Sequence, residues 1–594
     1  MTKVKIILFA FVLLLLNACS DDFLQINDLN NPTASTYYTS MSNAQDAVTG
    51  VYAGFNSGLS LYFGEIYYIL MYSTGEALYI HPESRYTDFN NYNYSSTNTL
   101  IAAYYEEWYN IVRRANDVIY GLRTMEQSGN YKDDDITKLR YMLGQCYFLR
   151  GVAYSNLVRS FGQRMPSNPD YSPDLPGVIL SDTVVVRREQ MYKERSSCGE
   201  VYNYVIKDFQ RAESLLPISW PSEDAGRATK GSAQAYLGET YVYLQKWDSA
   251  RIAFDKILAN PQYSLMQNFK HNFDYKYINN SESLFEVGFN NMVVGYGYGT
   301  HIYRSLALQS WGTSQVRSET VDKFSSSVVI NDQTLAAALA AKNLVYGSTQ
   351  KGYVDELINV SQAFKGHSFD GKEAFLNAIA SLTSIPFYKT DGTTYQPGVK
   401  AFLNAVSPKD PRLAVTVFTP KVDSIVVFVP ETKKWKKILF DYSVYGIRKY
   451  ISDSVNVDVA QAAGMGNDGY MSQNFRIMRL DDVYLYYAEV MHHLNRDDIA
   501  VEYINKIVRR ANGLPVNSTS PVDVSPTDVM KEIINQTFLE MCMEGKIWFH
   551  YRRWNIAKQE WSKYGYKENK NECLPIPQTE FDSNPGIKTQ NEGY

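Results

Sequence analysis

The chain has 594 residues, of which 45% are hydrophobic, and its formal net charge at pH 7 is −5. This apolar share is typical of a globular protein with a substantial core, and so small a net charge argues against a nucleic-acid-binding protein. Tyrosine outnumbers phenylalanine, 48 to 27. Tyrosine has an apolar ring face and a polar tip, which suits both helix seams and wet recognition surfaces.

The N-terminus has the pattern of a secretion signal with an acylation site. Two lysines precede an apolar run, Ile6–Leu16, that is too short to cross a membrane as a helix. Residues 16–19 (LNAC) resemble a bacterial lipobox with Cys19 as the acylated residue, and Ser20–Asp22 resembles an acidic signal for the outer leaflet of the outer membrane. We expect residues 1–18 to be removed and lipid to hold the mature chain at the cell exterior, since no other stretch could span a bilayer.

Several helices are predicted before the middle of the chain. Apolar residues favour helices over 43–58, 59–80, 101–125, 133–161 and 200–216. Residues 81–99 lack periodicity and predict a loop. Arg150 falls on an apolar stripe and needs a carboxylate partner, for which we expect Glu239 or Glu489. The run Asp133–Asp135 suits the N-terminal end of a helix better than a metal site.

Residues 229–258 have the pattern of a tetratricopeptide-like helical hairpin. Apolar and small residues from Ala233 to Leu244 share one face, and Asp248 can cap a second helix after a short break. The same pattern returns at 479–511. Tyr236, Glu239, Leu244, Ala250, Lys256 and Ile257 match Tyr486, Glu489, Leu494, Ala500, Lys506 and Ile507. One hairpin cannot bury its own apolar face, so this repeat predicts that the hairpins stack.

Helical order weakens between the two hairpins. The expected elements are a strand at 283–289, short helices at 332–346 and 371–382, and paired antiparallel strands at 414–418 and 424–429. The Gly- and Tyr-rich run 295–299 lacks the spacing of a phosphate loop, so we interpret its glycines as bends that expose rings. A long region of little periodicity between matching repeats is where we expect function.

The C-terminal part returns to helix and then becomes extended. Residues 529–554 predict one long helix, and the prolines between 575 and 585 argue against any further helix. The mature chain also contains Cys146, Cys198, Cys542 and Cys573. Cys146 and Cys542 lie in helical apolar patterns and are expected to be buried, no pair has metal-ligand spacing, and disulfide formation stays open.

These patterns predict a mainly α fold, a tetratricopeptide-like helical-repeat scaffold with a large irregular insert that contains a little β structure. We divide the chain into a signal peptide (1–18), an N-terminal helical part (19–290), a variable insert (291–475) and a C-terminal helical part (476–594). All parts after the signal peptide are expected to form one compact unit.

Motifs along nearly the whole mature chain resemble the SusD/RagB family of outer-membrane nutrient-binding lipoproteins. They are CSDDFL (19–24), WYNIVRRAN (108–116), FLR (148–150), FG (161–162), GRATK (226–230), DPR (410–412), RLDDVYLYYAE (479–489), EG (544–545), RRW (552–554) and LPIPQTE (574–580). The chain departs from the family pattern at Gln536–Phe538, Ile547 and His550, where charged residues are usual. Opposite charges lost together suggest a changed packing contact and a divergent member.

The resemblance implies an extracellular lid on a SusC-like TonB-dependent barrel transporter. Such a lid captures oligosaccharides, or peptides in some members as in RagB, and delivers them to the barrel. It implies no catalytic residue, no cofactor and no metal, although a structural Ca²⁺ stays open. It also implies an outer-membrane location.

Two stretches are expected to hold the ligand, because aromatic planes stack on sugar faces and amides bond hydroxyls. The resemblance places them before the WYNIV helix and after the strand near 285. The candidates are Tyr86, Phe89, Tyr92, Tyr94, Asn98, Tyr296, Tyr298, Tyr303 and Trp311. We expect at least two of these rings to share one exposed platform.

Two other classes of protein are weighed against nutrient binding. A surface glycoside hydrolase needs two facing carboxylates, yet Glu106-Glu107 and Asp133–Asp135 are expected on solvated helix surfaces. His492 and His493 are adjacent and diverge around a helix, so they cannot chelate a metal together. A scaffold that binds only a protein partner would leave the aromatic insert without a role.

Overall fold

The computed structural model describes the chain from residue 37 onward, with several gaps. It describes residues 37–56, 68–184, 188–289, 313–325, 327–369, 371–392, 394–407, 409–429, 434–439, 443–450 and 473–594. The predicted signal peptide and Cys19 lie outside these residues. Within the described ranges, no helix is long and apolar enough to cross a membrane.

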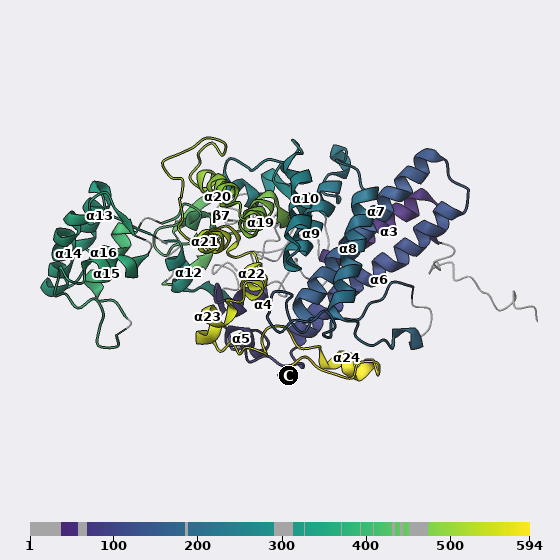
Figure 1. Ribbon diagram of the computed structural model, residues 1–594, viewed down its shortest axis with the longest axis horizontal. Coiled ribbons are helices and arrows are strands. Elements are labelled where there is room, and N and C mark those ends of the chain that lie inside the picture. The colour runs from purple at the N-terminus through teal and green to yellow at the C-terminus, as the bar shows by residue number, and fades with distance from the viewer. Residues whose placement is uncertain are drawn as a thin grey trace, which may run out of the picture.

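A row of packed helices forms the scaffold (Figure 1). In packing order these helices are α3 (Met41–Tyr52), α6 (Thr99–Gln127), α7 (Asp133–Phe161), α8 (Cys198–Leu215), α9 (Lys230–Tyr243), α10 (Trp247–Leu258), α19 (Leu480–His493), α20 (Asp497–Ala511) and α21 (Val529–Met541). Each helix packs against the next in this order. The mainly α fold and most of the predicted helices are therefore confirmed. The predicted helix over 59–80 is wrong in part, because among the described residues 68–73 are helical and 77–79 form a strand.

The two matching hairpins lie side by side, although more than two hundred residues separate them. Helix α10 of the first hairpin packs against α19 of the second. The rings of Phe254 and Tyr486 stack with centroids 6.2 Å apart, and the Tyr486 hydroxyl donates to Glu239 Oε1 at 2.8 Å. Gly238 leaves the space that the Phe254 ring fills, because a Cβ there would lie 2.3 Å from the ring. The predicted stacking of the hairpins is confirmed.

The insert leaves and rejoins the scaffold through two paired strands. β2 (Ser283–Val287) and β10 (Phe475–Arg479) run antiparallel, with Val287 opposite Phe475 and Glu286 opposite Arg476. The predicted strand near 285 is thus confirmed. Because the two strands pair, the chain enters and leaves the insert at one place on the scaffold.

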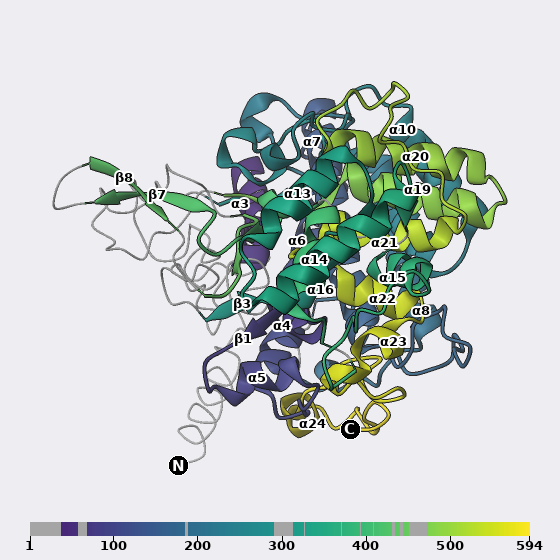
Figure 2. The same ribbon diagram turned by 90° about the vertical axis from the view of Figure 1, so that its left-hand side faces the viewer.

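Part of the insert is a small helical unit with its own apolar core, at the left end of Figure 1 and facing the viewer in Figure 2. It contains β4 (Val328–Val329), α13 (Asp332–Lys342), α14 (Ser348–Ser361), β5 (Ser368–Phe369), α15 (Lys372–Ile379) and α16 (Pro397–Val406). Two predicted helices correspond to α13 and α15. The expectation of little helical order is wrong for α14 and α16. α14 buries only two apolar side chains, Val354 and Leu357, and α16 begins with Pro397 and Gly398, a pair typical of turns.

The predicted strand pairing in the insert is also wrong. Residues 413–416 form the short helix α17 (Leu413–Thr416), and β6 (Val417–Phe418) pairs with β9 (Gly446–Ile447). β7 (Ser424–Val429) pairs instead with β8 (Lys434–Leu439), in a hairpin that projects from the helices in Figure 2. Alternating apolar residues identify a strand but do not identify its partner.

The remaining elements flank the scaffold. They are α4 (Tyr68–Ser73), β1 (Ala77–Tyr79), α5 (Ser84–Asn90), β3 (Ser314–Val316), α12 (Ser318–Lys323), α22 (Ile547–Arg553), α23 (Ala557–Trp561) and α24 (Gln578–Ser583). β1 pairs with β3. The predicted loop at 81–99 contains α5, whose residues Tyr86 and Phe89 face inward three positions apart. The predicted absence of helix near the C-terminus is wrong for α24, because Pro577 precedes its first residue and removes no helical hydrogen bond.

The predicted long helix over 529–554 is broken between α21 and α22. Met543 and Gly545 have φ values of 65° and 67°, in the left-handed region that no regular helix contains. The break turns the Glu544 side chain toward Lys449 and Arg479, at 2.6 and 2.8 Å. The break in the helix therefore places the Glu544 carboxylate in a buried ion-pair cluster.

The predicted partner of Arg150 is wrong. Its guanidinium donates to both carboxylate oxygens of Asp208, at 2.7 and 2.8 Å, and to Asn116 Oδ1 at 2.7 Å. Glu239 pairs instead with Arg159. Nine residues are about two and a half helical turns, so Arg150 and Arg159 leave α7 on opposite sides.

Candidate functional site

Five of the residues predicted to bind ligand lie in the core. Tyr86, Phe89, Tyr92 and Tyr94 are at most 4% exposed. Asn98 caps α6 by accepting hydrogen bonds from the Leu100 and Ile101 amides. We therefore correct their assignment from an exposed binding platform to packing.

The C-terminal segment covers these rings. Tyr94 stacks on Tyr594 with centroids 6.2 Å apart, and Tyr92 stacks on Trp561 at 6.3 Å. The Tyr92 hydroxyl also donates to the Ser73 carbonyl at 2.6 Å. The sequence around residue 90 carries no sign that the last residues of the chain return to it. The other four candidates, Tyr296, Tyr298, Tyr303 and Trp311, lie outside the described residues.

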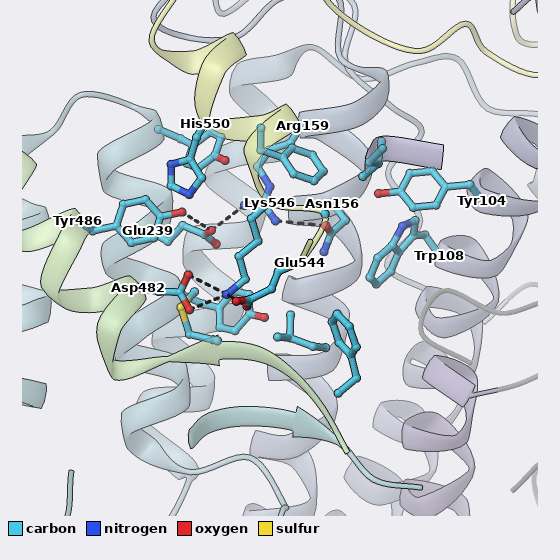
Figure 3. Close-up of a pocket in the computed structure, with 18 residues that line it drawn as sticks. Tyr104, Trp108, Asn156, Arg159, Glu239, Asp482, Tyr486, Glu544, Lys546 and His550 are labelled. Atoms are coloured by element: carbon cyan, nitrogen blue, oxygen red, sulfur yellow. Dashed lines mark hydrogen bonds and ion pairs between the residues drawn. The ribbon is translucent and has the colours of Figure 1, made fainter. Parts of the chain in front are cut away.

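A cavity of about 70 Å³, lined by charged and aromatic side chains, lies where the hairpins meet the C-terminal helices (Figure 3). The labelled side chains around it are Tyr104, Trp108, Asn156, Arg159, Glu239, Asp482, Tyr486, Glu544, Lys546 and His550. They come from α6, α7, α9, α19 and the segment from Glu544 into α22. Residues of two of the family-like motifs, RLDDVYLYYAE and EG, thus line adjacent sides of the cavity.

Opposite charges are paired around this cavity. Arg159 Nη1 lies 2.8 Å from Glu239 Oε1. Lys546 Nζ donates to both oxygens of Asp482, at 2.8 and 2.7 Å. Burial raises the pKa of Asp482 to about 6, although the Lys546 ammonium acts in the opposite direction. Burial, together with the charge on Arg553, lowers the pKa of His550 well below its usual value, so this imidazole is neutral.

The matched glutamates of the two hairpins have matching partners. Glu239 pairs with Arg159 of α7, and Glu489 pairs with Arg553 of α22, whose Nη2 donates to Glu489 Oε2 at 2.6 Å. Sequence reasoning missed both pairs. The recurrence of a glutamate at one position of each hairpin was the signal that could have indicated them.

The cavity is well below the roughly 300–1,000 Å³ of typical small-molecule sites. It is large enough to hold ordered water. Among the described residues, Glu239 Oε2 has no hydrogen-bond partner and would accept from such a water. Because the carboxylates are already paired with cations, the arrangement supports interior hydration and cohesion rather than acid–base catalysis.

A second charge cluster has the composition of a metal site. Ligand atoms of Glu282, Asp481 and Glu540 lie within 4.8 Å of one another, and all three side chains are buried. The Arg510 guanidinium lies among them and contacts Glu282 at 3.1 Å, Asp481 at 3.3 Å and Glu540 more closely. Burial raises the pKa of Glu282 to about 7, with Arg510 opposing it. Arg510 therefore supplies the positive charge that these carboxylates need.

The four described cysteines, Cys146, Cys198, Cys542 and Cys573, are buried and free. Burial raises the pKa of the Cys146 and Cys573 thiols to about 12. These thiols are therefore protonated and act as small core side chains.

Stacked antiparallel helix pairs around a buried charge network define a helical-repeat scaffold of the tetratricopeptide type. A family model described as "SusD family" matches residues 282–594, and a second, "Starch-binding associating with outer membrane", matches residues 60–244. The chain belongs to the SusD family.

Named relatives match the whole chain or part of it. "SusD-like protein P2" of Formosa agariphila is 22% identical over 610 residues and covers 100% of both chains. A "SusD-like protein" of Bacteroides ovatus is 24% identical over 295 residues, which are 48% of this chain and 49% of the relative.

Solved structures share the fold. A SusD superfamily protein from Bacteroides vulgatus superposes with a TM-score of 0.63 at 21% identity, covering 94% of this chain and 100% of its own. A "Laminarin binding SusD-like protein" has a TM-score of 0.62 at 20% identity, covering 93% and 100%. Surface glycan-binding protein A from Bacteroides thetaiotaomicron, in complex with laminarihexaose, has a TM-score of 0.59 at 18% identity, covering 93% and 100%.

Proposed function

We propose that this protein is a cell-surface lipoprotein that binds an oligosaccharide and delivers it to a SusC-like TonB-dependent transporter of the outer membrane. The observation that carries the proposal is the match to the SusD family along the whole chain. An oligosaccharide is favoured over a peptide because one family model is described as starch-binding and two similar structures are named for glucan ligands.

The anchor would be an acyl chain on Cys19. The apolar run Ile6–Leu16 and the acidic residues after Cys19 support export and surface display. A lipid anchor would keep the binding scaffold beside the mouth of its transporter, so that bound ligand has a short path to the barrel.

Binding without hydrolysis is part of the proposal. The buried carboxylates Glu239, Asp482 and Glu544 are each paired with a cation, which leaves neither a free general acid nor a free general base among them. After incubation of the purified protein with laminarihexaose and maltohexaose, mass spectrometry is expected to show that neither hexasaccharide has been shortened.

The remaining predicted stacking residues are Tyr296, Tyr298, Tyr303 and Trp311. We expect Trp311→Ala and Tyr296→Ala each to weaken oligosaccharide binding about tenfold, because a ligand face stacked on one aromatic ring contributes on the order of 1–3 kcal/mol, as measured for nucleobases. Isothermal titration of the purified mature chain (residues 19–594) with laminarihexaose, maltohexaose and a peptide panel would measure this.

The control is Tyr120→Ala, which removes an exposed ring from the scaffold helix α6. Its dissociation constant is expected to equal that of the wild type. Equal affinities for the wild type and both ring variants would reject these contacts. Binding of peptides alone would reject the oligosaccharide as ligand, and failure to co-purify with a TonB-dependent barrel would reject delivery.

A further inference from the structure

Two adjoining hollows form a surface groove between the end of α3, the loop before α9 and the turn before β2. Their volumes are about 370 and 280 Å³, which is within or close to the size range of small-molecule sites. Both hollows are lined by Ala225, Gly226, Arg227, Asn279, Phe285 and Glu286. We call these two hollows together the α3–β2 groove.

Aromatic side chains line both hollows of the groove. Tyr52 lies in the larger hollow, and Trp220 and Tyr263 lie in the smaller one; all three side chains are half-buried. Their polar atoms are bonded within the protein. The Tyr52 hydroxyl accepts from the Ala228 amide at 2.9 Å, and Trp220 Nε1 donates to the Ala228 carbonyl at 2.8 Å. What these residues can offer a ligand is therefore mainly the apolar surface of their rings.

Side-chain amides that are available to a ligand lie beside these rings. The side chains of Asn279 and Gln262 are exposed, and no hydrogen bond joins either to another described residue. Asn56 Oδ1, in the larger hollow, is buried and lacks a partner among the described residues. An amide both donates and accepts, which matches the hydroxyl groups of a sugar.

A buried carboxylate holds Asn279 in place. Asn279 has a φ of 51°, and its backbone amide donates to Glu286 Oε1 at 2.8 Å. Glu286 also accepts from Asn474 Nδ2 at 2.6 Å and from the Ser283 hydroxyl at 2.7 Å. The turn that presents the Asn279 side chain is therefore fixed before any ligand arrives, which reduces the entropy lost on binding.

The charges of the groove are largely balanced. Arg227 Nε lies 2.7 Å from Asp224 Oδ1. Glu286 is buried, and Arg476 Nε lies 3.5 Å from its Oε2. Glu223 adds a further carboxylate at the exposed rim. A groove without excess positive charge does not favour phosphate, sulfate or uronate groups.

We propose that the α3–β2 groove is a contact site for an uncharged sugar segment, separate from the predicted rings at 296–311. The inference rests on the proposed oligosaccharide binding. Rings would pack on the C–H faces of one or two sugar units, while Asn279 and Gln262 bond their hydroxyls. The groove would extend the surface along which the protein contacts one oligosaccharide.

The test compares amides inside and outside the groove. Asn279→Gly removes the amide and suits the left-handed backbone, and Gln262→Ala is combined with it. Asn495→Gly is the matched control, because Asn495 is also exposed, has a φ of 59° and makes no side-chain hydrogen bond with another described residue. Isothermal titration with laminarihexaose and maltohexaose is expected to give a dissociation constant about tenfold weaker for the double variant, and unchanged for the control.

The outcomes separate the two proposals. If the wild type binds either hexasaccharide and the double variant binds it equally well, the groove is not a sugar contact, while the proposed function stands. If the wild type binds neither hexasaccharide, the proposed function and the groove assignment both fail. Equal weakening in Asn495→Gly would show a general effect of the substitution and would also reject the groove.

Discussion

Replacing Arg510 by methionine is expected to lower the free energy of unfolding by about 3–5 kcal/mol. The substitution keeps the apolar volume but removes the guanidinium that contacts Glu282, Asp481 and Glu540. Arg479 still faces Asp481 at 3.1 Å, and Arg412 still faces Glu540 at 2.8 Å, whereas Glu282 loses its ion-pair partner. A urea titration followed by circular dichroism would measure the loss.

A double-mutant cycle identifies the cause of this loss. Adding Glu282→Gln to Arg510→Met is expected to recover part of the stability, because the glutamine places no unpaired charge in the core. Arg496→Met removes an arginine from an exposed pair with Asp498 and is the control, with an unchanged unfolding midpoint. Stability of Arg510→Met equal to that of the wild type would contradict the assigned role of Arg510.

Replacing Glu76 by glutamine is expected to stabilise the protein increasingly as pH rises. Glu76 is 1% exposed, and burial raises its pKa from 4.5 to about 7. Because the folded-state pKa lies above the unfolded one, protonation favours the fold. This stabilisation is complete below about pH 4.5 and is lost as pH rises through about 7. Glutamine resembles the protonated acid at every pH.

The contacts of Glu76 agree with a protonated side chain. The Thr74 hydroxyl lies 2.8 Å from the Met71 carbonyl and 2.6 Å from Glu76 Oε2, yet it has only one proton to donate. A neutral Glu76 satisfies all three groups by donating to Thr74 Oγ1, while its other oxygen accepts from the Met543 amide at 2.6 Å. Glutamine can make the same two contacts.

The measurement is the urea midpoint of Glu76→Gln and wild type at several pH values. The stability difference is expected to grow by about 2–3 kcal/mol between pH 5 and pH 8. Glu106→Gln, on the exposed side of α6, controls for the loss of a carboxylate. A difference for Glu76→Gln that does not change with pH would show that Glu76 is ionised in the fold throughout.

Long helices and repeated hairpins could be predicted from the sequence because their signals are local. The apolar stripes of α6 and α7 extend over many turns, and the matched residues of α9/α10 and α19/α20 required a stacked arrangement. The break at Met543–Gly545 could not be predicted, since the residues around it continue an apolar pattern and the contact made by Glu544 is distant in sequence. Helix α14 has 14 residues but buries only two apolar side chains, so its apolar pattern does not stand out.

The site was harder to predict than the fold. Tyr92 and Tyr94 have the composition of a binding loop, but their environment is set by Trp561 and Tyr594, which arrive from the other end of the chain. The partner of Arg150 was wrong for the same reason, because it depends on which side of α7 each neighbouring helix occupies. Buried ion pairs and ring stacks are decided by tertiary arrangement, which a single sequence reveals only through its repeats.

The apolar core of residues 328–406 is separate from the core of the scaffold. Its buried side chains, such as Leu357, Phe375 and Phe402, pack with one another and not with the scaffold core. Heat is therefore expected to melt this small unit in its own transition, visible by calorimetry as a shoulder or a second peak. Substitutions there can accumulate without weakening the scaffold, which leaves this end of the protein free to diverge.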